Sequence, residues 1–359
     1  MRYEVIDGSM GEGGGQILRT ALALSAILGK PVKVVNIRAK RSKPGLQRQH
    51  LISVRAISQI SSARVEGARL GSKEVVFIPG RVRGGKYFFD IGTAGSVTLV
   101  LQALIPVAVY SKDSVEIIIR GGTDVPWSPP IDYYRFVFLR ILEKFGVESE
   151  IALRRRGHYP RGGGEIQFRM SKPPGQLSSV MLDKRGEVVR IEGLSHAVKL
   201  PSHVAERQAR SAMEYLRGSL GKVPIYVEKE WYEVSRDPHL GPGSGIVLWA
   251  ITERSILGGD ALGAKGKPAE KVGEEAATKL VEDLNTNMAL DRHASDMILV
   301  YSSLACGTSV IGGSRLTLHA LTSIELIRIM IPEVNIAFLE GGEQDKPFIL
   351  RIDGICLTR

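Results

Sequence analysis

Hydrophobic residues along this chain alternate with polar ones in short runs and recur every three to four positions in longer segments, which are the patterns of strands and amphipathic helices. Residues 7–29 and 90–110 each pass from a short alternating run through an aspartate and a glycine-rich turn into an apolar helical segment. A β-rich run follows each of them, at 32–39 and at 114–122. The two regions are therefore predicted to share one order of elements.

Each β-rich run leads into a longer amphipathic segment and then into two further strand-like runs. The predicted helices span 45–60 and 132–146, and the predicted strand pairs are 64–67 with 74–78 and 147–153 with 165–169. The order strand, helix, strand, helix, strand, strand thus occurs twice at a period of roughly 85 residues, and repeated order of this kind indicates an internal duplication.

A third copy of this order is predicted near the C-terminus. In residues 314–329 the alternation of Leu316 and Leu318 predicts a short strand, the apolar spacing that follows predicts a helix, and residues 334–341 form a closing strand. His319 then lies at the junction of strand and helix. There it could pack and cap the helix, or it could act as a nucleophile at the edge of a pocket.

The region from 184 to 284 interrupts the repeated order. Its patterns predict helices at 204–220 and 269–285 and strands at 223–230 and 245–254. Because a unit of this size is typical of a small domain, we predict an α/β (α+β) fold in which three βαβαββ repeats carry an insertion. The main domain comprises residues 1–183 and 285–359, and a smaller α+β domain, residues 184–284, is inserted in the third repeat.

The composition favours a globular protein with an anionic partner. Of the 359 residues, 43% are hydrophobic and 24% are charged, and the formal net charge of +10 favours nucleic acid or phosphorylated small molecules. The most apolar stretch, 97–110, contains Gln102 and Pro106 and is too short to span a membrane. The N-terminus lacks the pattern of a signal peptide. Cys306 and Cys356 have no metal-ligand spacing, so we expect a reducing, cytoplasmic compartment and no membrane partner.

A glycine-rich turn at 11–20 carries the first candidate chemistry. Glycines let a backbone approach a ligand closely, and amides at the start of a helix can face an anion. No Gly-Lys-Ser/Thr follows, so the turn is not a P-loop, and Gln16 occupies the place of the last glycine of a dinucleotide-binding turn. Glu12 offers an oxygen ligand for Mg²⁺ and Arg19 offers a guanidinium for phosphate. A tight packing turn would also explain the glycines.

A basic loop within residues 37–50 is the second candidate. Five cations are crowded there with no acidic residue between them: Arg38, Lys40, Arg41, Lys43 and Arg48. Such charges repel one another unless an anion binds, and the Pro-Gly pair after Lys43 prevents a continuous helix. The expected ligand of this loop is a phosphodiester backbone. A solvated surface is the alternative.

Two further segments contain histidines. Residues 154–168 combine three consecutive arginines, a His-Tyr-Pro corner and three consecutive glycines, but a hairpin turn with a basic rim would explain them, so His158 is assigned no role. His293 and Asp296 are three residues apart and would share one face of a helix, either toward a ligand or as a surface pair. No spacing in the chain matches a Ser-His-Asp or Cys-His triad or a structural zinc site.

Seven stretches, in one order that spans nearly the whole chain, resemble the RNA 3′-terminal phosphate cyclases. They are DGSMGEGGGQILR, RAKRSKPGLQRQH, IGTAGSVTLVLQALIP, GGTDVPWSPP, RGHYPRGGGEI, SHVAERQA and the region around His319. The resemblance implies three βαβαββ repeats, as in the related enolpyruvyl transferases, with a small α+β domain inserted. It also implies an ATP-dependent enzyme that converts an RNA 3′-terminal phosphate to a 2′,3′-cyclic phosphodiester, with Mg²⁺ or Mn²⁺ as the metal.

The resemblance also assigns roles to residues. His319 matches the histidine that attacks the α-phosphate of ATP to form histidine-AMP, from which an RNA(3′)pp(5′)A intermediate arises. Glu12 matches the metal-binding glutamate. Positions around the adenosine and its phosphates are matched by Gln102, Pro129, His293 and Asp296. The basic surface for the RNA end is matched by Arg19, Arg38, Arg41 and Lys43. A homo-oligomer is left open.

Two alternatives come from other functional classes. A non-catalytic RNA-binding relative that acts in ribosome assembly would share the fold but lack the nucleophilic histidine, so the presence of His319 with Glu12 argues against it. An enolpyruvyl transferase would share the repeat architecture, but the basic loop and the triple glycine do not suit phosphoenolpyruvate.

Overall fold

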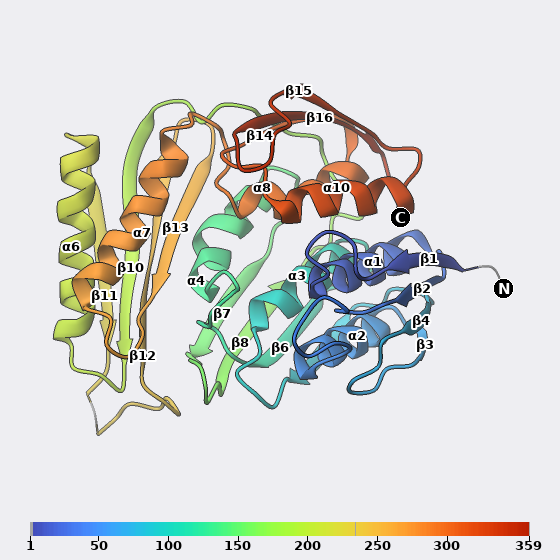
Figure 1. The fold of residues 1–359 in the computed structure, drawn as a ribbon, viewed down its shortest axis with the longest axis horizontal. Helices are drawn as coiled ribbons and strands as arrows, with labels where there is room; N and C mark the ends of the chain where they lie inside the picture. Colours follow the sequence, from blue (N-terminus) through green and yellow to red (C-terminus); the bar gives the residue numbers. More distant parts are fainter. Residues whose placement is uncertain (1–2, 234, 359) are drawn as a thin grey trace.

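The computed structural model describes residues 3–233 and 235–358, and their strands form four four-stranded sheets (Figure 1). Three of these sheets share one strand order. In each, the first two strands along the chain pair in parallel, and the last strand pairs antiparallel with both the second and the third. Three copies of a βαβαββ unit would produce this shared order. The predicted α/β class is confirmed.

The strands of these three sheets follow one another along the chain. The first sheet contains β1 (Glu4–Asp7), β2 (Val32–Val35), β3 (Arg64–Glu66) and β4 (Val75–Ile78). The second contains β5 (Gly85–Asp90), β6 (Val115–Gly121), β7 (Glu150–Arg155) and β8 (Gly164–Met170). The third contains β9 (Met181–Leu182), β14 (Cys306–Gly313), β15 (Asn335–Glu340) and β16 (Phe348–Ile355).

Helices connect these strands and cover the inner faces of the sheets. They are α1 (Gly15–Leu28), α2 (Arg48–Ile60), α3 (Val97–Val109), α4 (Ile131–Tyr133), a π-helical turn η1 (Tyr134–Phe138), α5 (Leu139–Glu143), α8 (Ala294–Met297), α9 (Leu299–Leu304) and α10 (Leu318–Met330). Helix α1 packs against α2, α3 and α10. The helices therefore bring their glycine-rich and polar starts into one region of the molecule.

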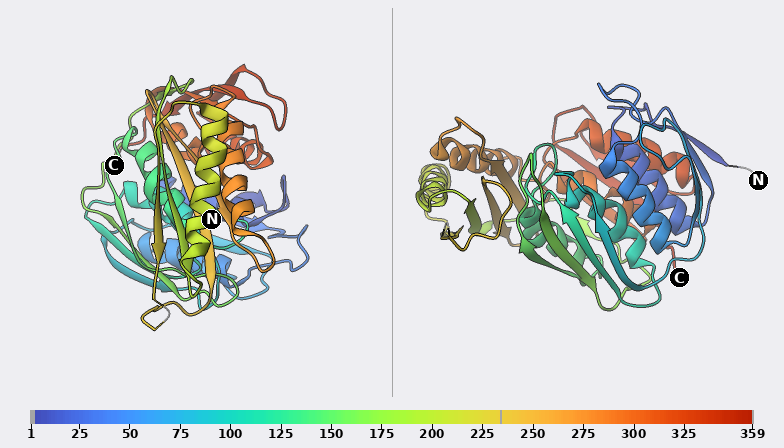
Figure 2. Two further views of the ribbon diagram at one scale, coloured as in Figure 1. Left: turned by 90° about the vertical axis from the view of Figure 1, so that its left-hand side faces the viewer. Right: turned by 90° about the horizontal axis from the view of Figure 1, so that it is seen from below.

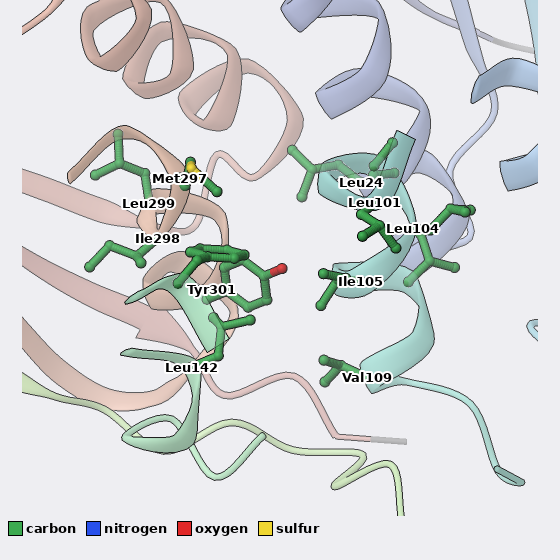
Figure 3. Packing of buried hydrophobic residues seen from close by; sticks show 14 of the residues in the cluster. Leu24, Leu101, Leu104, Ile105, Val109, Leu142, Met297, Ile298, Leu299 and Tyr301 are labelled. Carbon is green, nitrogen blue, oxygen red and sulfur yellow. The ribbon is translucent and has the colours of Figure 1, made fainter. Parts of the chain in front are cut away.

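Helix α3 lies at the centre of the main hydrophobic core. In Figure 3, Leu101 and Ile105 of α3 lie opposite Met297 of α8 and Tyr301 of α9. Full burial of each such aliphatic side chain contributes about 1.5–3 kcal/mol. The apolar character of α3 thus reflects a central packing position. Among the residues that the structure describes, no helix is both long enough and apolar enough to cross a membrane.

The fourth sheet lies at one end of the molecule with two helices on its outer face (Figure 2). It consists of β10 (Val188–Val198), β11 (Ile225–Trp231), β12 (Gly243–Thr252) and β13 (Ile256–Leu262), and the helices are α6 (His203–Leu220) and α7 (Ala269–Leu284). Along β12, Ile246 and Leu248 belong to the core under the two helices, whereas Val247 and Trp249 belong to the main core. The period of two of a strand thus directs one face to each core. The domain bounds at 184 and 284 stay a prediction.

The strand predicted at the start of 314–329 is wrong. Strand β14 ends at Gly313, and Thr317 caps α10 by accepting a hydrogen bond from the amide of Ala320 at 3.0 Å. Leu316 is fully buried but belongs to the connecting loop, while Leu318 is the first residue of the helix. Two leucines two positions apart do not distinguish a strand from a loop that enters a helix.

The spacing of the two cysteines in the sequence did not indicate that they are partners. Cys306, the first residue of β14, and Cys356, which follows β16, form a disulfide at one end of the two central strands of the third sheet. Antiparallel pairing of β14 with β16 places Cys306 opposite Ile355, so Cys356, the residue after Ile355, lies beside Cys306. The two cysteines are separated by 50 residues, and sequence spacing does not reveal a contact that depends on strand register.

Candidate functional site

A cleft of about 880 Å³ lies where the N-terminal turns of α1, α2, α3 and α10 converge. Gly15 and Gln16 begin α1, His50 lies in the first turn of α2, and His319 is the second residue of α10. The first amides of a helix have no partners within it, and the helix dipole is positive at that end. Four helix starts at one cleft therefore favour a ligand with several negative charges.

His319 is held at the cleft by Gln16. The Nδ1 atom of His319 lies 2.6 Å from Oε1 of Gln16. The amide of Gln16 has one orientation because its nitrogen donates to the backbone oxygen of His319 at 3.0 Å and to Oγ of Ser323 at 2.8 Å. Its oxygen can only accept, so a neutral His319 carries its proton on Nδ1 and has a free electron pair on Nε2.

Burial favours the neutral form of His319. Desolvation lowers the pKa of His319; Glu12 opposes this shift, and the positive charges of Arg19 and Arg41 reinforce it. The side chain nevertheless remains 46% exposed, so Nε2 is accessible from the cleft. A neutral imidazole with a free nitrogen at neutral pH is a competent nucleophile.

Glu12 lies between the histidine and the basic loop. Its Oε2 is 3.7 Å from Nε2 of His319 and accepts a hydrogen bond from Arg41 at 2.8 Å. The carboxylate is partly exposed toward the cleft. A carboxylate in this position could hold a divalent cation together with phosphate oxygens, the arrangement Mg²⁺ prefers.

The other arginines line the same cleft at different depths. Arg19 is buried and donates to Oε1 of Gln102 at 3.5 Å, and burial lowers its pKa to about 10. Arg38 adopts a left-handed backbone conformation and donates to the carbonyl oxygens of Lys43 and Gly45, which fixes the loop around it. Lys43 itself is exposed and is absent from the residues that line the cleft.

The opposite wall contains His293, Asp296 and Pro129. His293 lies 3.7 Å from Oδ1 of Asp260 and contacts the ring of Tyr133 edge-on. Burial raises the pKa of the Asp296 carboxyl to about 8, with smaller contributions from the charges of Asp291 and Glu12, while a hydrogen bond from Thr317 at 2.7 Å opposes the shift. Asp296 is therefore protonated near neutral pH.

The structure thus brings together all of the predicted site residues except Lys43. It also adds residues that the sequence analysis did not assign to the site: Gln16, Gln49, His50, Trp127, Tyr159 and Thr317. Gln16 had a signal in the sequence, because a polar residue replaced glycine in a glycine-rich turn. His50 had none, and burial next to Arg19 and Arg38 lowers its pKa to about 3.

Comparison with known proteins agrees with this geometry. The family model for RNA 3′-terminal phosphate cyclase matches residues 10–336. Curated relatives with that name include one from Hyperthermus butylicus, 63% identical over 98% of both chains, and one from Ignicoccus hospitalis, 57% identical over 99% of both. A third, from Pyrococcus furiosus, is 51% identical over 95% of this chain and 96% of its own. The chain that forms this cleft belongs to the RNA 3′-terminal phosphate cyclase family.

Proposed function

We propose that this protein uses ATP to convert an RNA 3′-terminal phosphate into a 2′,3′-cyclic phosphodiester, with His319 as the nucleophile. The observation that carries the proposal is the hydrogen bond between Nδ1 of His319 and Gln16, which leaves Nε2 free among cations at a cleft of helix starts. Membership of the cyclase family supports the same reaction.

In the first step Nε2 of His319 attacks the α-phosphate of ATP. A nitrogen–phosphorus bond forms, the bond to the bridging oxygen breaks, and pyrophosphate leaves with its electron pair. Arg19, Arg41 and the helix amides offset the negative charges on the phosphates and so stabilise the transition state electrostatically. Gln16 keeps the imidazole in the reactive tautomer, and the proton on Nδ1 stays with the ring.

A divalent cation suits the carboxylate of Glu12. The cleft offers this hard oxygen ligand next to the nucleophile, and phosphate oxygens of ATP would complete the coordination. Bound there, Mg²⁺ or Mn²⁺ would neutralise phosphate charge. Arg41 already pairs with Glu12 at 2.8 Å, so the arginine would have to share the carboxylate or turn toward phosphate.

The adenosine would lie against the wall formed by Pro129 and His293, near Gln102 and Asp296. Asp296 can donate a hydrogen bond near neutral pH because burial keeps it protonated. The RNA end would approach along the basic loop, where Arg38 and Arg41 face the cleft and Lys43 is exposed outside it. Contacts to a phosphodiester backbone there would depend on salt.

In the later steps the adenylate moves from His319 to the RNA 3′-phosphate, which gives the RNA(3′)pp(5′)A intermediate and frees the histidine. The vicinal 2′-hydroxyl then attacks the same phosphorus, the bond to AMP breaks, and the ring closes. This closure is intramolecular, so proximity supplies much of its rate once the phosphate is activated.

The test is incubation of the full chain with ATP labelled at the α-phosphate and Mg²⁺, followed by denaturation and detection of acid-labile label. We expect label on the wild type and on the control His203→Ala, whose histidine is exposed on α6, and none on His319→Ala. Equal labelling of His319→Ala would overturn the proposal. RNA binding by a wild type that takes up no label would favour the assembly-factor alternative.

A further inference from the structure

Asp124, His158 and His196 meet in the interior where the second sheet faces the fourth. Asp124 follows β6, His158 lies in the turn between β7 and β8, and His196 lies on β10. Their side chains are buried, with 1%, 7% and 1% of their surface exposed. Buried imidazole and carboxylate groups need partners that satisfy them.

The donor atoms of these three residues are spaced as ligands of one ion. The two Nε2 atoms are 3.2 Å apart, and one ligand atom from each of the three residues lies within 4.8 Å of the others. Zinc binds histidine nitrogen at about 2.0–2.1 Å, so two nitrogens at a tetrahedral angle lie about 3.3 Å apart. The separation of the imidazoles therefore suits a shared cation.

The charges around the three residues also favour a cation. Arg156 is fully buried and pairs with Asp124, Asp132 and Glu230, and Arg135 also pairs with Asp132, so two guanidiniums face three carboxylates. Two neutral histidines add no charge to this balance. A divalent ion would offset the remaining negative charge.

The surrounding backbone holds the histidine in place. A Cβ on Gly243 of β12 would lie 2.0 Å from Cγ of His158, so the ring fills the space that a side chain would otherwise occupy. Nearby, Nε2 of His239 is buried and has no hydrogen-bond partner among the described residues, while its Nδ1 lies 2.7 Å from Asp237. Histidines that ligate a metal are commonly oriented by a carboxylate in this way. His239 itself is not one of the three residues whose ligand atoms lie close together.

We propose that Asp124, His158 and His196 form a binding site for a divalent cation of the zinc type that joins the fourth sheet to the second. Two nitrogen ligands and one oxygen ligand favour Zn²⁺ or Co²⁺ over Mg²⁺. The site is separate from the one at Glu12 and has a structural role. It would also anchor the loops that carry Trp127 and Tyr159, two exposed aromatic residues that line the cleft.

Metal binding can be measured without ATP or RNA, so the result is independent of the proposed reaction. The full chain with Glu12→Gln, which removes the carboxylate at the cleft, is treated with a chelator and titrated with Zn²⁺ against a chromophoric competitor. We expect one equivalent of Zn²⁺ to bind tightly. A second titration with Co²⁺ should give the intense visible absorption of a four-coordinate nitrogen and oxygen site.

Variants in the same background decide where the ion binds. His158→Gln and His196→Gln should each weaken Zn²⁺ binding by more than about 100-fold, because loss of even an outer partner of a metal ligand costs about 10–100-fold. His203→Gln, a histidine exposed on α6, should bind as before. Circular dichroism checks folding, and Asp124→Asn provides a third variant of nearly unchanged shape if a histidine variant unfolds.

Two results would overturn the proposal. One is the absence of a tight equivalent of Zn²⁺ on the folded chain, in which case a simple hydrogen bond between two neutral imidazoles explains the 3.2 Å contact. The other is tight binding that persists in all three ligand variants, which would place the ion elsewhere.

Discussion

The reactive nitrogen of His319 is selected by a single neighbouring side chain. The side-chain oxygen of Gln16 accepts a hydrogen bond from Nδ1 of His319. The amide nitrogen of Gln16 donates to the backbone oxygen of His319 and to Ser323, which fixes the orientation of the amide. These contacts join the start of α1 to the start of α10, 303 residues apart in the chain. Chemistry at His319 therefore depends on a residue that has no reactive group of its own.

Gln16→Ala should lower the rate of self-adenylation by about 10–100-fold, because the imidazole loses the acceptor that fixes its tautomer and direction. Binding of ATP should change much less, since Gln16 contacts the histidine. The measurement is the rate of label uptake as a function of ATP concentration. Gln59→Ala, an exposed glutamine on α2, is the matched control, and an unchanged rate in Gln16→Ala would contradict the assignment.

Asp296 should make the stability of the fold depend on pH. Burial raises its pKa from 3.8 to about 8, so between about pH 4 and pH 8 the folded chain keeps a proton that the unfolded chain releases. The stability that this proton contributes is complete below about pH 4 and is lost as the pH rises through about 8. Since one pKa unit corresponds to about 1.4 kcal/mol, the loss should exceed 1.4 kcal/mol.

The measurement for Asp296 is the free energy of unfolding in guanidinium chloride across that range. Relative to Asp296→Asn, which has no proton to release and keeps an acceptor for Thr317, the wild type should become steadily less stable from pH 4 to pH 9. Parallel curves for the two proteins would show that Asp296 is ionised throughout.

At the scale of elements, the start of α10 decides where the nucleophile lies. Thr317 accepts from the amide of Ala320 at 3.0 Å and donates to Asp296 at 2.7 Å, so one hydroxyl caps the helix and ties it to α8. The periodicity of the sequence predicted the body of this helix well, because buried positions recur at helical spacing. The predicted start of the helix was wrong, because the alternation of Leu316 and Leu318 does not distinguish a strand from a loop that enters a helix.

Thr317→Ala should lower the free energy of unfolding by about 1 kcal/mol through loss of the helix cap and should also slow self-adenylation. Thr317→Ser keeps the hydroxyl and should retain most of the stability and most of the rate of self-adenylation. Denaturant unfolding and label uptake on the same preparations separate the two effects. If Thr317→Ala is as stable and active as Thr317→Ser, the cap does not position His319.

At the scale of the whole molecule, a buried ionic network joins the fourth sheet to the rest. Arg156 contacts Asp124 in the loop after β6, Asp132 of α4 and Glu230 of β11. The glycines and arginines at 154–168 form an unusual pattern, which a hairpin turn with a basic rim would also explain. Their purpose depends on carboxylates that are distant in the chain, so the pattern alone could not reveal it.

Arg156→Met should destabilise the protein by about 3–5 kcal/mol, because it leaves buried carboxylates without their partner. Arg154→Met is the matched control two residues away: its partner Glu165 is 3.1 Å distant and Arg154 is 45% exposed, so the cost should stay below about 1 kcal/mol. Guanidinium unfolding measures both. Similar costs for the two variants would argue against the network as the main tie.

The sequence by itself indicated most of the helices and strands, since burial on one face imposes a period that can be read locally. It also indicated most of the residues at the cleft, because glycine turns and crowded cations are unusual without a ligand. Tertiary structure alone decided the tautomer of His319, the protonation of Asp296, the disulfide of Cys306 with Cys356 and the cluster of Asp124 with two histidines. Each of these depends on distances between residues far apart in the chain, and local patterns do not encode such distances.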